Sequence, residues 1–357
     1  MDSSSECILL CRAGYEGDAA AQIQKVAANA GVYGFCKTQA DSGYLRFITH
    51  NPQALAAWFA HLSLNELIFA RQICLAEQTL TDLPAKNRLG PILCALDGRA
   101  FSQVRVETPD AEATRPLMRL ARQFTKPLEQ AMRQREQLQP GNTSLPVLHL
   151  TFISSTSVII GTSQPGQTTN WTMGIPRLKL RRDAPSRSAL KLEEAMLTFL
   201  SHQQRQEMLR SGLEAVDLGA APGGWTWQLL QYGLMVTAVD NGPLAEYLTQ
   251  HPAIEHRRED GFSFRPERPV AWLVCDMVEK PTRVAQLMAQ WLADGDAQRA
   301  MFNLKLPMKR RQQAVEACIN LIDEHLTGQS LDYQLSMRQL YHDRDEITAY
   351  LRWDWGY

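Results

Sequence analysis

The sequence of 357 residues has almost no excess charge, because 37 Lys and Arg residues balance 38 Asp and Glu residues. This balance excludes a protein that coats nucleic acid through bulk positive charge, so a polyanion would have to bind at local basic patches. The sequence also lacks any apolar run near the ~20 residues that cross a bilayer. Its first residues lack the basic start and the small-residue cleavage site of a secretory signal. We therefore expect an unexported protein that does not enter a membrane.

Metal-binding motifs are equally scarce. The seven cysteines form no Cys-x-x-Cys, and the eight histidines form no His-Glu-x-x-His. Cys7 and Cys11 are spaced Cys-x-x-x-Cys, but no second ligand pair accompanies them, so no metal site is expected. An odd number of scattered cysteines is typical of buried thiols in a reducing compartment, which favours the cytoplasm.

The composition, 45% apolar and 21% charged, is that of a globular protein, and the length suggests two or three domains. Strand-like and helix-like segments alternate over residues 1–80 and again over 81–162, which predicts two small α+β units. The second unit is expected to contain helices at 112–124 and 126–137. Their Arg and Lys residues are typical of a solvated helix face, with a surface that contacts RNA phosphates as the alternative.

Residues 163–187 are rich in Pro, Gly and Thr and are predicted to form a linker. The linker becomes basic toward its end, which fits either a nucleic-acid strand beside a catalytic domain or a soluble connector. The cations of this cluster are Arg177, Lys179, Arg181, Arg182 and Arg187.

From 188 to 357, apolar strands alternate with helices, which predicts an α/β fold with a doubly wound, Rossmann-like parallel sheet. The last two expected strands are close enough in sequence to pair as an antiparallel edge. The strands are expected at 215–218, 235–239, 272–275, 301–304, 333–341 and 346–353.

The strongest local signal is a glycine-rich segment between an expected strand and helix, Asp217-Leu218-Gly219-Ala220-Ala221-Pro222-Gly223-Gly224. Glycine lets the backbone approach a ligand closely, and a helix N-terminus offers free N–H groups. The segment matches neither the dinucleotide fingerprint nor the phosphate-cradling loop.

Acidic residues follow successive strands. Asp240 ends the next strand, where a doubly wound fold places an acid against a ribose diol. Asp260 follows the strand after that, where it could accept a hydrogen bond from an adenine amino group. Together with Asp217, these acids fit a ligand that carries adenosine without phosphate, and S-adenosylmethionine (SAM) is such a ligand. Each acid alone is more simply explained as a helix or turn cap.

Further motifs point to one family. They are Ser-Arg-Ser-Ala-Leu-Lys-Leu at 186–192, the glycine-rich segment, Cys-Asp-Met at 275–277, Asn-Leu-Lys at 303–305 and Arg-Asp-Glu at 344–346. This set resembles the RrmJ/fibrillarin-type SAM-dependent ribose 2′-O-methyltransferases. It also resembles the RlmM-type enzymes, which methylate a cytidine ribose in the peptidyl-transferase region of bacterial 23S rRNA. The similarity is dense from about 173 to 349 and looser before it.

The resemblance implies a domain plan and a partner. The plan is a ferredoxin-like domain at 1–80, a THUMP-like RNA-binding domain at 81–162, the basic linker at 163–187 and a methyltransferase domain at 188–357. The partner is 23S rRNA in the bacterial cytoplasm, before or early in assembly of the large subunit.

The resemblance also implies site residues. The catalytic tetrad maps onto Lys191, Asp276, Lys305 and Glu346. The cofactor-binding residues map onto Ser188, Gly219, Ala221, Pro222, Gly223, Gly224, Asp240, Asp260 and Asp276. With Lys309 and Arg310, the linker cations Arg177, Lys179, Arg181, Arg182 and Arg187 would form a phosphate track.

The chemistry fits these residue types. A ribose hydroxyl is a poor nucleophile at neutral pH, so a base must take its proton. A free Lys titrates near ~10.4, and a second ammonium or desolvation lowers that pKa. Lys305 is the expected base and Lys191 the neighbouring ammonium. Asp276 would hold the lysines and the hydroxyl in line with the sulfonium, and Glu346 would complete the array.

Three alternatives remain open at this point. A base methyltransferase is disfavoured for two reasons. Amino-directed enzymes carry Pro-Pro where this sequence has Asp276-Met277-Val278-Glu279. Cytosine C5 enzymes need a thiolate nucleophile there, but Cys275 would point to the face of the strand opposite Asp276. An RNA-binding module without activity is disfavoured by the complete tetrad. A nicotinamide dehydrogenase is disfavoured by the missing glycine pattern.

Overall fold

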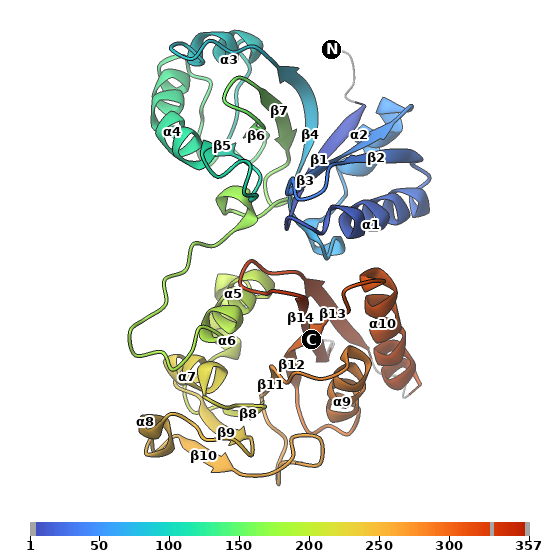
Figure 1. Ribbon diagram of the computed structural model, residues 1–357, viewed down its shortest axis with the longest axis vertical. Helices are drawn as coiled ribbons and strands as arrows, with labels where there is room; N and C mark the ends of the chain where they lie inside the picture. The colour runs from blue at the N-terminus through green and yellow to red at the C-terminus, as the bar shows by residue number, and fades with distance from the viewer. Residues whose placement is uncertain (1–4, 329–331, 354–357) are drawn as a thin grey trace. The chain divides into compact units, whose positions relative to one another are not determined.

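The computed structural model describes residues 5–328 and 332–353, and the chain divides into two compact units, Met1–Pro176 and Arg177–Tyr357 (Figure 1). Each unit is built on its own seven-stranded sheet. Across the described residues, every helix is too short or too polar to span a bilayer.

Unit 1 contains a mixed sheet in the spatial order β2-β3-β1-β4-β7-β6-β5. Neighbouring strands are antiparallel except for β5 and β6. The strands are β1 (Glu6–Cys11), β2 (Gly34–Thr38), β3 (Tyr44–Thr49), β4 (Ala70–Leu80), β5 (Gln103–Glu107), β6 (Val147–Phe152) and β7 (Val158–Ser163). The helices are α1 (Glu16–Asn29), α2 (Pro52–Phe59), α3 (Leu89–Ala95) and α4 (Leu117–Gln134), with 3-10 turns η1 (Leu64–Glu66) and η2 (Thr172–Gly174). Because β4 pairs with both β1 and β7, one continuous sheet joins the segments expected to form two α+β units.

The prediction of two helices at 112–124 and 126–137 is wrong. A single helix, α4, runs from Leu117 to Gln134 and contains Pro127 in its interior. An internal proline removes a backbone donor and costs about 3 kcal/mol. The helix continues because Ala121, Leu128 and Met132 lie at helical spacing and are buried in one apolar cluster with the sheet.

The first half of the expected linker packs into unit 1. The backbone N–H of Met173 donates to Oε1 of the buried Glu107 at 2.5 Å. The same carboxylate contacts Nδ1 of His149 at 3.0 Å, and the other ring nitrogen of His149 contacts Ser163. Burial acts to raise the pKa of Glu107, but His149 and the N–H donors outweigh it, so the pKa is lowered. This buried polar group ties four segments together around residue 107.

Unit 2 contains a sheet in the order β10-β9-β8-β11-β12-β14-β13. The first five are parallel, and β14 and β13 are antiparallel additions. The strands are β8 (Glu214–Leu218), β9 (Met235–Val239), β10 (Ile254–Arg257), β11 (Trp272–Cys275), β12 (Arg299–Lys305), β13 (Tyr333–Arg338) and β14 (Glu346–Trp353). The helices are α5 (Ala189–Phe199), α6 (His202–Met208), α7 (Gly224–Gln231), α8 (Glu246–Thr249), α9 (Pro281–Ala293) and α10 (Arg311–Thr327). The expected doubly wound sheet with an antiparallel edge is confirmed.

Helices cover both faces of this sheet (Figure 1). On one face, α5 and α7 bury Leu192, Met196 and Leu229 in a cluster with Trp272 and Val274 of β11. The opposite face carries α9, which packs on β12 and against α10. Side chains alternate along a strand, so Leu273 and Cys275 point to the face opposite Trp272 and Val274.

The end of β13 and the two edge strands β2 and β10 differ from expectation. The strand expected at 333–341 ends at Arg338, because the following residues form a loop in which the Leu340 N–H donates to Asp343. Edge strand β2 was not predicted, and β10 was expected only as a strand without bounds before Asp260, since neither shows clear apolar alternation.

Candidate active site

The order of strands in unit 2 reverses between β8 and β11. From β8 the chain winds outward through β9 to β10, and from β11 it winds outward the other way through β12. In sheets of this type, ligands bind outside the carboxyl ends of the strands at the reversal. The glycine-rich segment follows β8, and Asp276 follows β11, so both lie at this point.

A cavity of about 270 Å³ opens at this point. It is lined by Ser186, Ser188, Gly219, Ala220, Ala221, Pro222, Trp225 and Asp276. Five of these eight residues, Ser188, Gly219, Ala221, Pro222 and Asp276, were expected to contact the cofactor. Gly223 and Gly224 start helix α7 directly behind the loop.

Two glycines are required by the geometry of this loop. Gly219 has a φ of 77°, and a Cβ there would come within 2.5 Å of Met277 Cγ. A Cβ on Gly224 would come within 2.1 Å of Ser188 Oγ and 2.4 Å of Ser186 Oγ. Glycine at these positions therefore lets β11 and the start of α5 close around the cavity.

The three acids have different environments. Asp240 accepts hydrogen bonds from the N–H groups of Ala221 (3.0 Å) and Gly242 (2.7 Å), so it braces the loop. Asp260 is exposed and accepts one bond through Oδ1, from the N–H of Phe262. Asp217 is fully buried and accepts from the Thr226 hydroxyl at 2.6 Å. Burial raises the pKa of Asp217 to about 7. Asp217 holds the first turn of α7 through Thr226 and does not line the cavity.

The expected catalytic residues come from four elements at one edge of the sheet. Lys191 in α5 places Nζ 2.5 Å from Glu346 Oε1 and 3.3 Å from Asp276 Oδ1. Lys305 is the last residue of β12 and pairs in register with Glu346, the first residue of β14. Since directly opposed residues share a face of an antiparallel pair, Lys305 and Glu346 project to the same side.

The two lysines differ in their surroundings. The side chain of Lys191 is only 17% exposed. Burial acts to lower the pKa of Lys191, but Asp276 and Glu346 outweigh it, so the pKa is raised and the ammonium form is favoured. Lys305 is exposed, and within the described part of the chain it forms no hydrogen bond or ion pair. The described residues therefore supply neither the burial expected around Lys305 nor its contact with Asp276.

Asp276 is held by two donors. Besides Lys191, the amide Nδ2 of Asn303 donates to Asp276 Oδ1 at 2.7 Å. Burial raises the pKa of Asp276, while Lys191 and Asn303 act against that rise. The carboxylate therefore depends on both donors to remain ionised at neutral pH.

Comparison with known proteins identifies the family. The curated ribosomal RNA large subunit methyltransferase M of Aromatoleum aromaticum is 46% identical over 98% of this chain and 95% of its own length. That of Methylococcus capsulatus is 46% identical over 98% and 99%, and that of Erwinia tasmaniensis is 44% identical over 99% and 97%. This chain belongs to the RlmM family.

Family models agree with this assignment. Residues 4–74 match the RlmM ferredoxin-like domain, 87–164 the N-terminal model of ribosomal RNA large subunit methyltransferase M, and 184–322 the FtsJ-like methyltransferase. Among solved structures, Aeropyrum pernix fibrillarin in complex with S-adenosyl-L-methionine aligns with 57% of this chain and 81% of its own. That alignment has 13% identity and a TM-score of 0.36, and the family assignment does not depend on it.

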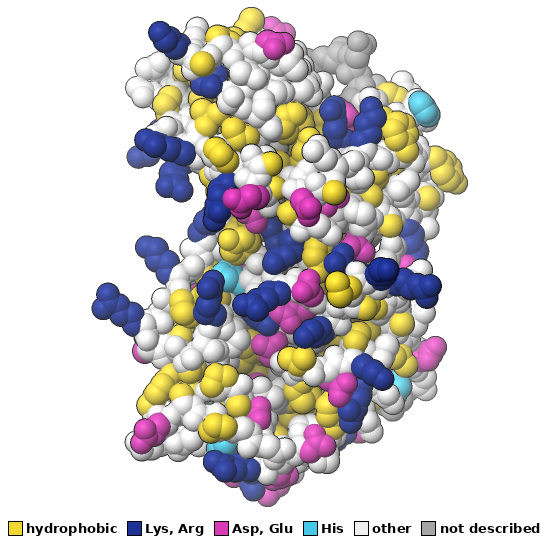
Figure 2. Space-filling view, viewed as in Figure 1, with side chains coloured by type: hydrophobic (Ala, Val, Ile, Leu, Met, Phe, Trp, Pro, Cys, Tyr) yellow, Lys and Arg dark blue, Asp and Glu magenta, His cyan; other side chains and the backbone are white. Residues whose placement is uncertain are grey.

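The cations expected to bind RNA are all exposed residues of unit 2. Figure 2 shows Lys and Arg side chains scattered among acidic and apolar ones, as the near-zero net charge implies. Arg181 has partners within the chain. Its guanidinium contacts Asp183 at 2.9 Å and Gln231 at 2.8 Å and lies 5.2 Å from the Trp227 ring centroid. Arg181 thus fastens the linker to α7.

Several residues of this RlmM-family site were not singled out from the sequence. Ser186 and Trp225 line the cavity, and Asn303 and Thr348 lie beside the tetrad. A signal was present for Asn303, because it stands two residues before Lys305 in a strand and therefore shares its face.

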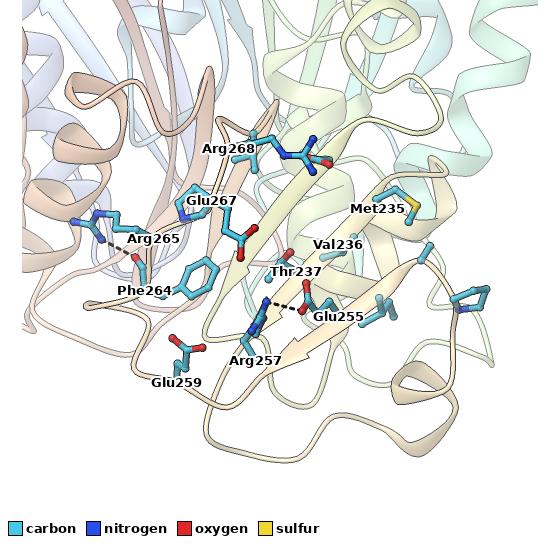
Figure 3. A pocket seen from close by; sticks show the side chains of 16 residues that line it. Met235, Val236, Thr237, Glu255, Arg257, Glu259, Phe264, Arg265, Glu267 and Arg268 are labelled. Carbon is cyan, nitrogen blue, oxygen red and sulfur yellow. Dashed lines mark hydrogen bonds and ion pairs between the residues drawn. The ribbon is translucent and has the colours of Figure 1, made fainter.

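A larger cavity of about 410 Å³ lies elsewhere (Figure 3). It is lined by Glu214, Met235 and Ile254, the first residues of β8, β9 and β10, and is therefore at the amino ends of the strands. Arg257 and Glu255 form an ion pair of 2.7 Å within it. Size alone does not mark the active site, because ligands bind at the carboxyl ends in this fold.

Proposed function

We propose that this protein transfers a methyl group from SAM to the 2′-hydroxyl of a cytidine ribose in the peptidyl-transferase region of 23S rRNA, with Lys305 as general base. The reaction would take place in the bacterial cytoplasm, before or early in assembly of the large subunit. The single observation that carries the chemistry is the contact of Lys191 with Asp276 and Glu346, with Lys305 on the strand position opposite Glu346, at the sheet end that holds the glycine-rich loop.

The cavity residues fit SAM. Gly219 and Gly224 leave room that a Cβ would fill, and no lysine follows the loop to hold a phosphate. Trp225 also lines the cavity, and its indole Nε1 is buried without a hydrogen-bond partner among the described residues. Asp240 and Asp260 would accept hydrogen bonds from the ribose and the adenine amino group, and Ser188 and the loop backbone would hold the remainder. When bound, SAM supplies an electrophilic methyl group on a sulfonium.

The chain's residues divide the work. Lys191 stays protonated between Asp276 and Glu346 and holds these carboxylates in place. Lys305 lies opposite Glu346, and its side chain has no partner among residues 5–328 and 332–353, so its amine is available to take the proton of the ribose hydroxyl. RNA that covers this end of the sheet would exclude water from Lys305 and supply the desolvation that the described residues do not. The fixed carboxylates orient the hydroxyl toward the cavity.

The substrate would be guided by local cations. Arg177, Lys179, Arg182, Arg187, Lys309 and Arg310 are exposed in unit 2, and phosphate contacts from such residues position RNA without reading its sequence. We propose that residues 81–162 act as a THUMP-like RNA-binding domain and 1–80 as a ferredoxin-like domain. The linker cluster would then lead the RNA strand to the methyltransferase domain.

A base methyltransferase is the second candidate, and Cys275 argues against it. A cytosine C5 enzyme needs a reactive thiolate, but Cys275 is fully buried on the face of β11 opposite Trp272 and Val274. Burial raises its pKa to about 12. A thiol in such an environment is inert.

The test is methyl transfer to unmodified 23S rRNA. Purified protein, labelled SAM and either naked transcript or particles from cells lacking the protein are incubated, and the digested nucleosides are separated. We expect 2′-O-methylcytidine at one position. A methylated base, or no transfer to either substrate, would overturn the proposal, and the better substrate reveals the stage of assembly.

A further inference from the structure

A chain of hydrogen bonds leads from the β13–β14 loop to the active-site carboxylate. Oγ1 of Thr348 lies 3.1 and 3.2 Å from the two carboxyl oxygens of Asp343. The same Oγ1 lies 2.7 Å from Oδ1 of Asn303, whose Nδ2 lies 2.7 Å from Oδ1 of Asp276. Three residues, none of which is in the proposed tetrad, therefore connect to Asp276.

Because these residues are buried, the donor and the acceptor of each hydrogen bond in the chain can be assigned. Asn303, Thr348 and Asp343 are 2%, 0% and 1% exposed, so each polar group depends on partners in the protein. The Asn303 amide must present its NH₂ to the Asp276 carboxylate, which only accepts. Its carbonyl oxygen then accepts from the Thr348 hydroxyl, whose single proton is used in that bond.

The donor in the last hydrogen bond of the chain is assigned to Asp343. Since the Thr348 proton points to Asn303, the contact with Asp343 is a hydrogen bond only when the Asp343 carboxyl is protonated and donates. Burial raises the pKa of Asp343 well above its usual range, and Glu346 and Glu194 act the same way. The Leu340 N–H and Lys191 act against this rise. A protonated Asp343 would hold Thr348, and Thr348 would hold the Asn303 amide in one orientation.

We propose that Asn303 is a positioning residue of the site that would bind the ribose hydroxyl. Thr348 and Asp343 orient the Asn303 amide, and this amide holds the Asp276 carboxylate toward Lys191. The effect on methyl transfer rests on the proposed function, whereas the effect on Asp276 itself does not. Asn303 touches neither cofactor nor RNA in this account and acts only through Asp276.

The charges around Asp276 explain why the hydrogen bond from Asn303 is needed to keep this carboxylate ionised. Lys191 from α5 favours the ionised form, while Glu346 from β14 and Asp217 from β8 oppose it. Burial opposes it as well, so the amide is one of two groups that keep the carboxylate charged. Losing a hydrogen bond to a charged group should raise the Asp276 pKa by about one unit or more.

The direct test is the titration of Asp276 in the free protein. Protein with ¹³C-labelled Asp carboxyls is titrated by NMR, and the Asp276 signal is assigned by its absence in Asp276→Asn. We expect Asn303→Leu and Thr348→Val to raise the Asp276 pKa, and Thr348→Ser, which keeps the hydroxyl, to leave it near the wild-type value. Adding Thr348→Val to Asn303→Leu should change it no further, because Thr348 acts through Asn303.

The second readout is the kinetics of methyl transfer. Asn303→Leu should lower kcat about ten- to a hundred-fold with KM for RNA and the affinity for SAM unchanged. The loss should be largest at acidic pH and shrink as pH rises, because Asp276 would ionise later. An Asp276 pKa that is the same in wild type, Asn303→Leu and Thr348→Val would overturn the inference, even if activity falls.

The two proposals fail separately. If Asn303→Leu does not fold, Thr348→Val tests the same chain of bonds. If the wild-type protein transfers no methyl group, the proposed function fails, and the titration still decides whether Asn303 and Thr348 control Asp276.

Discussion

Lys305 and Glu346 stand directly opposite each other, at the end of β12 and the start of β14. The carboxylate of Glu346 nevertheless pairs with Lys191, at 2.5 Å, and leaves Lys305 without an ion pair in the described part of the chain. Two lysines at the carboxyl ends of the strands thus differ in their surroundings. Lys191 is held as a cation, and we propose that Lys305 exchanges a proton with the substrate.

Replacing Lys191 with Met should remove the cation that Asp276 and Glu346 share. Two partly buried carboxylates would then face each other, so one of them should take up a proton near neutral pH. We expect methyl transfer to fall at least tenfold and the acidic limb of the rate profile to move to higher pH. Steady-state rates from pH 5 to 10 check this, with Lys37→Met, an exposed lysine of unit 1 outside the proposed RNA-binding domain, as the matched control. An unchanged profile would contradict the role given to Lys191.

Asp240→Ala should weaken SAM binding. The variant loses the proposed bonds to the ribose and the two N–H bonds that brace the loop at Ala221 and Gly242. Bonds to a charged group contribute about 1.5–3 kcal/mol, so the Kd should rise about ten- to a hundred-fold. Calorimetric titration with SAM measures it. Asp294→Ala, which removes an exposed acid at the far end of α9, is the control, and equal affinities for both variants would refute the assignment.

The basic residues should separate into two groups. Arg182→Gln, Lys309→Gln and Arg310→Gln should each weaken RNA binding and reduce the salt dependence by about one phosphate contact. Arg181→Gln should instead lower the melting temperature, because Arg181 is bound to Asp183, Gln231 and Trp227. Filter binding at several salt concentrations, together with melting curves, tells them apart. The separation would be refuted if Arg181→Gln proved the most damaging to RNA binding and left stability intact.

Asp217 should make stability depend on pH. Its pKa is raised to about 7 by burial, whereas an unfolded Asp titrates near ~3.9. Between these values the folded protein holds a proton that the unfolded chain has lost, so stability from this group falls as pH rises from about 4 to 7. Asp217→Asn should flatten this part of the curve of melting temperature against pH. Asp260→Asn, an exposed acid, should leave the curve as in wild type, and identical slopes in all three proteins would contradict the prediction.

Much of unit 2 could be predicted because its strands are short apolar runs bounded by turns. β9, β11 and β14 begin and end where the sequence predicts. The full length of helix α4 could not be predicted. Pro127 locally predicts that a helix ends, whereas the helix continues because Leu128 and Met132 are buried in the tertiary structure. The bounds of edge strand β10 could not be predicted, because an edge strand needs no apolar alternation.

For the site as well, the sequence predicts which residues gather but not the contacts that depend on tertiary structure. Motif spacing brings Lys191, Asp276, Lys305 and Glu346 to one edge once the sheet is recognised as doubly wound. The bond from Asn303 to Asp276 depends on the lateral pairing of β11 with β12, and the bond from Thr348 on the register of β14. The partners of Arg181 likewise depend on how the linker folds back on α7, which no sequence period encodes.

The central claim is tested most directly by Lys305→Ala in a single-turnover assay. SAM affinity and RNA affinity are measured first, and both should stay close to wild type because Lys305 belongs neither to the cavity lining nor to the proposed phosphate track. The rate of 2′-O-methylcytidine formation should then fall about 10²- to 10⁴-fold, the usual contribution of a general base. A variant that binds both ligands and still forms 2′-O-methylcytidine at the wild-type rate would contradict the account.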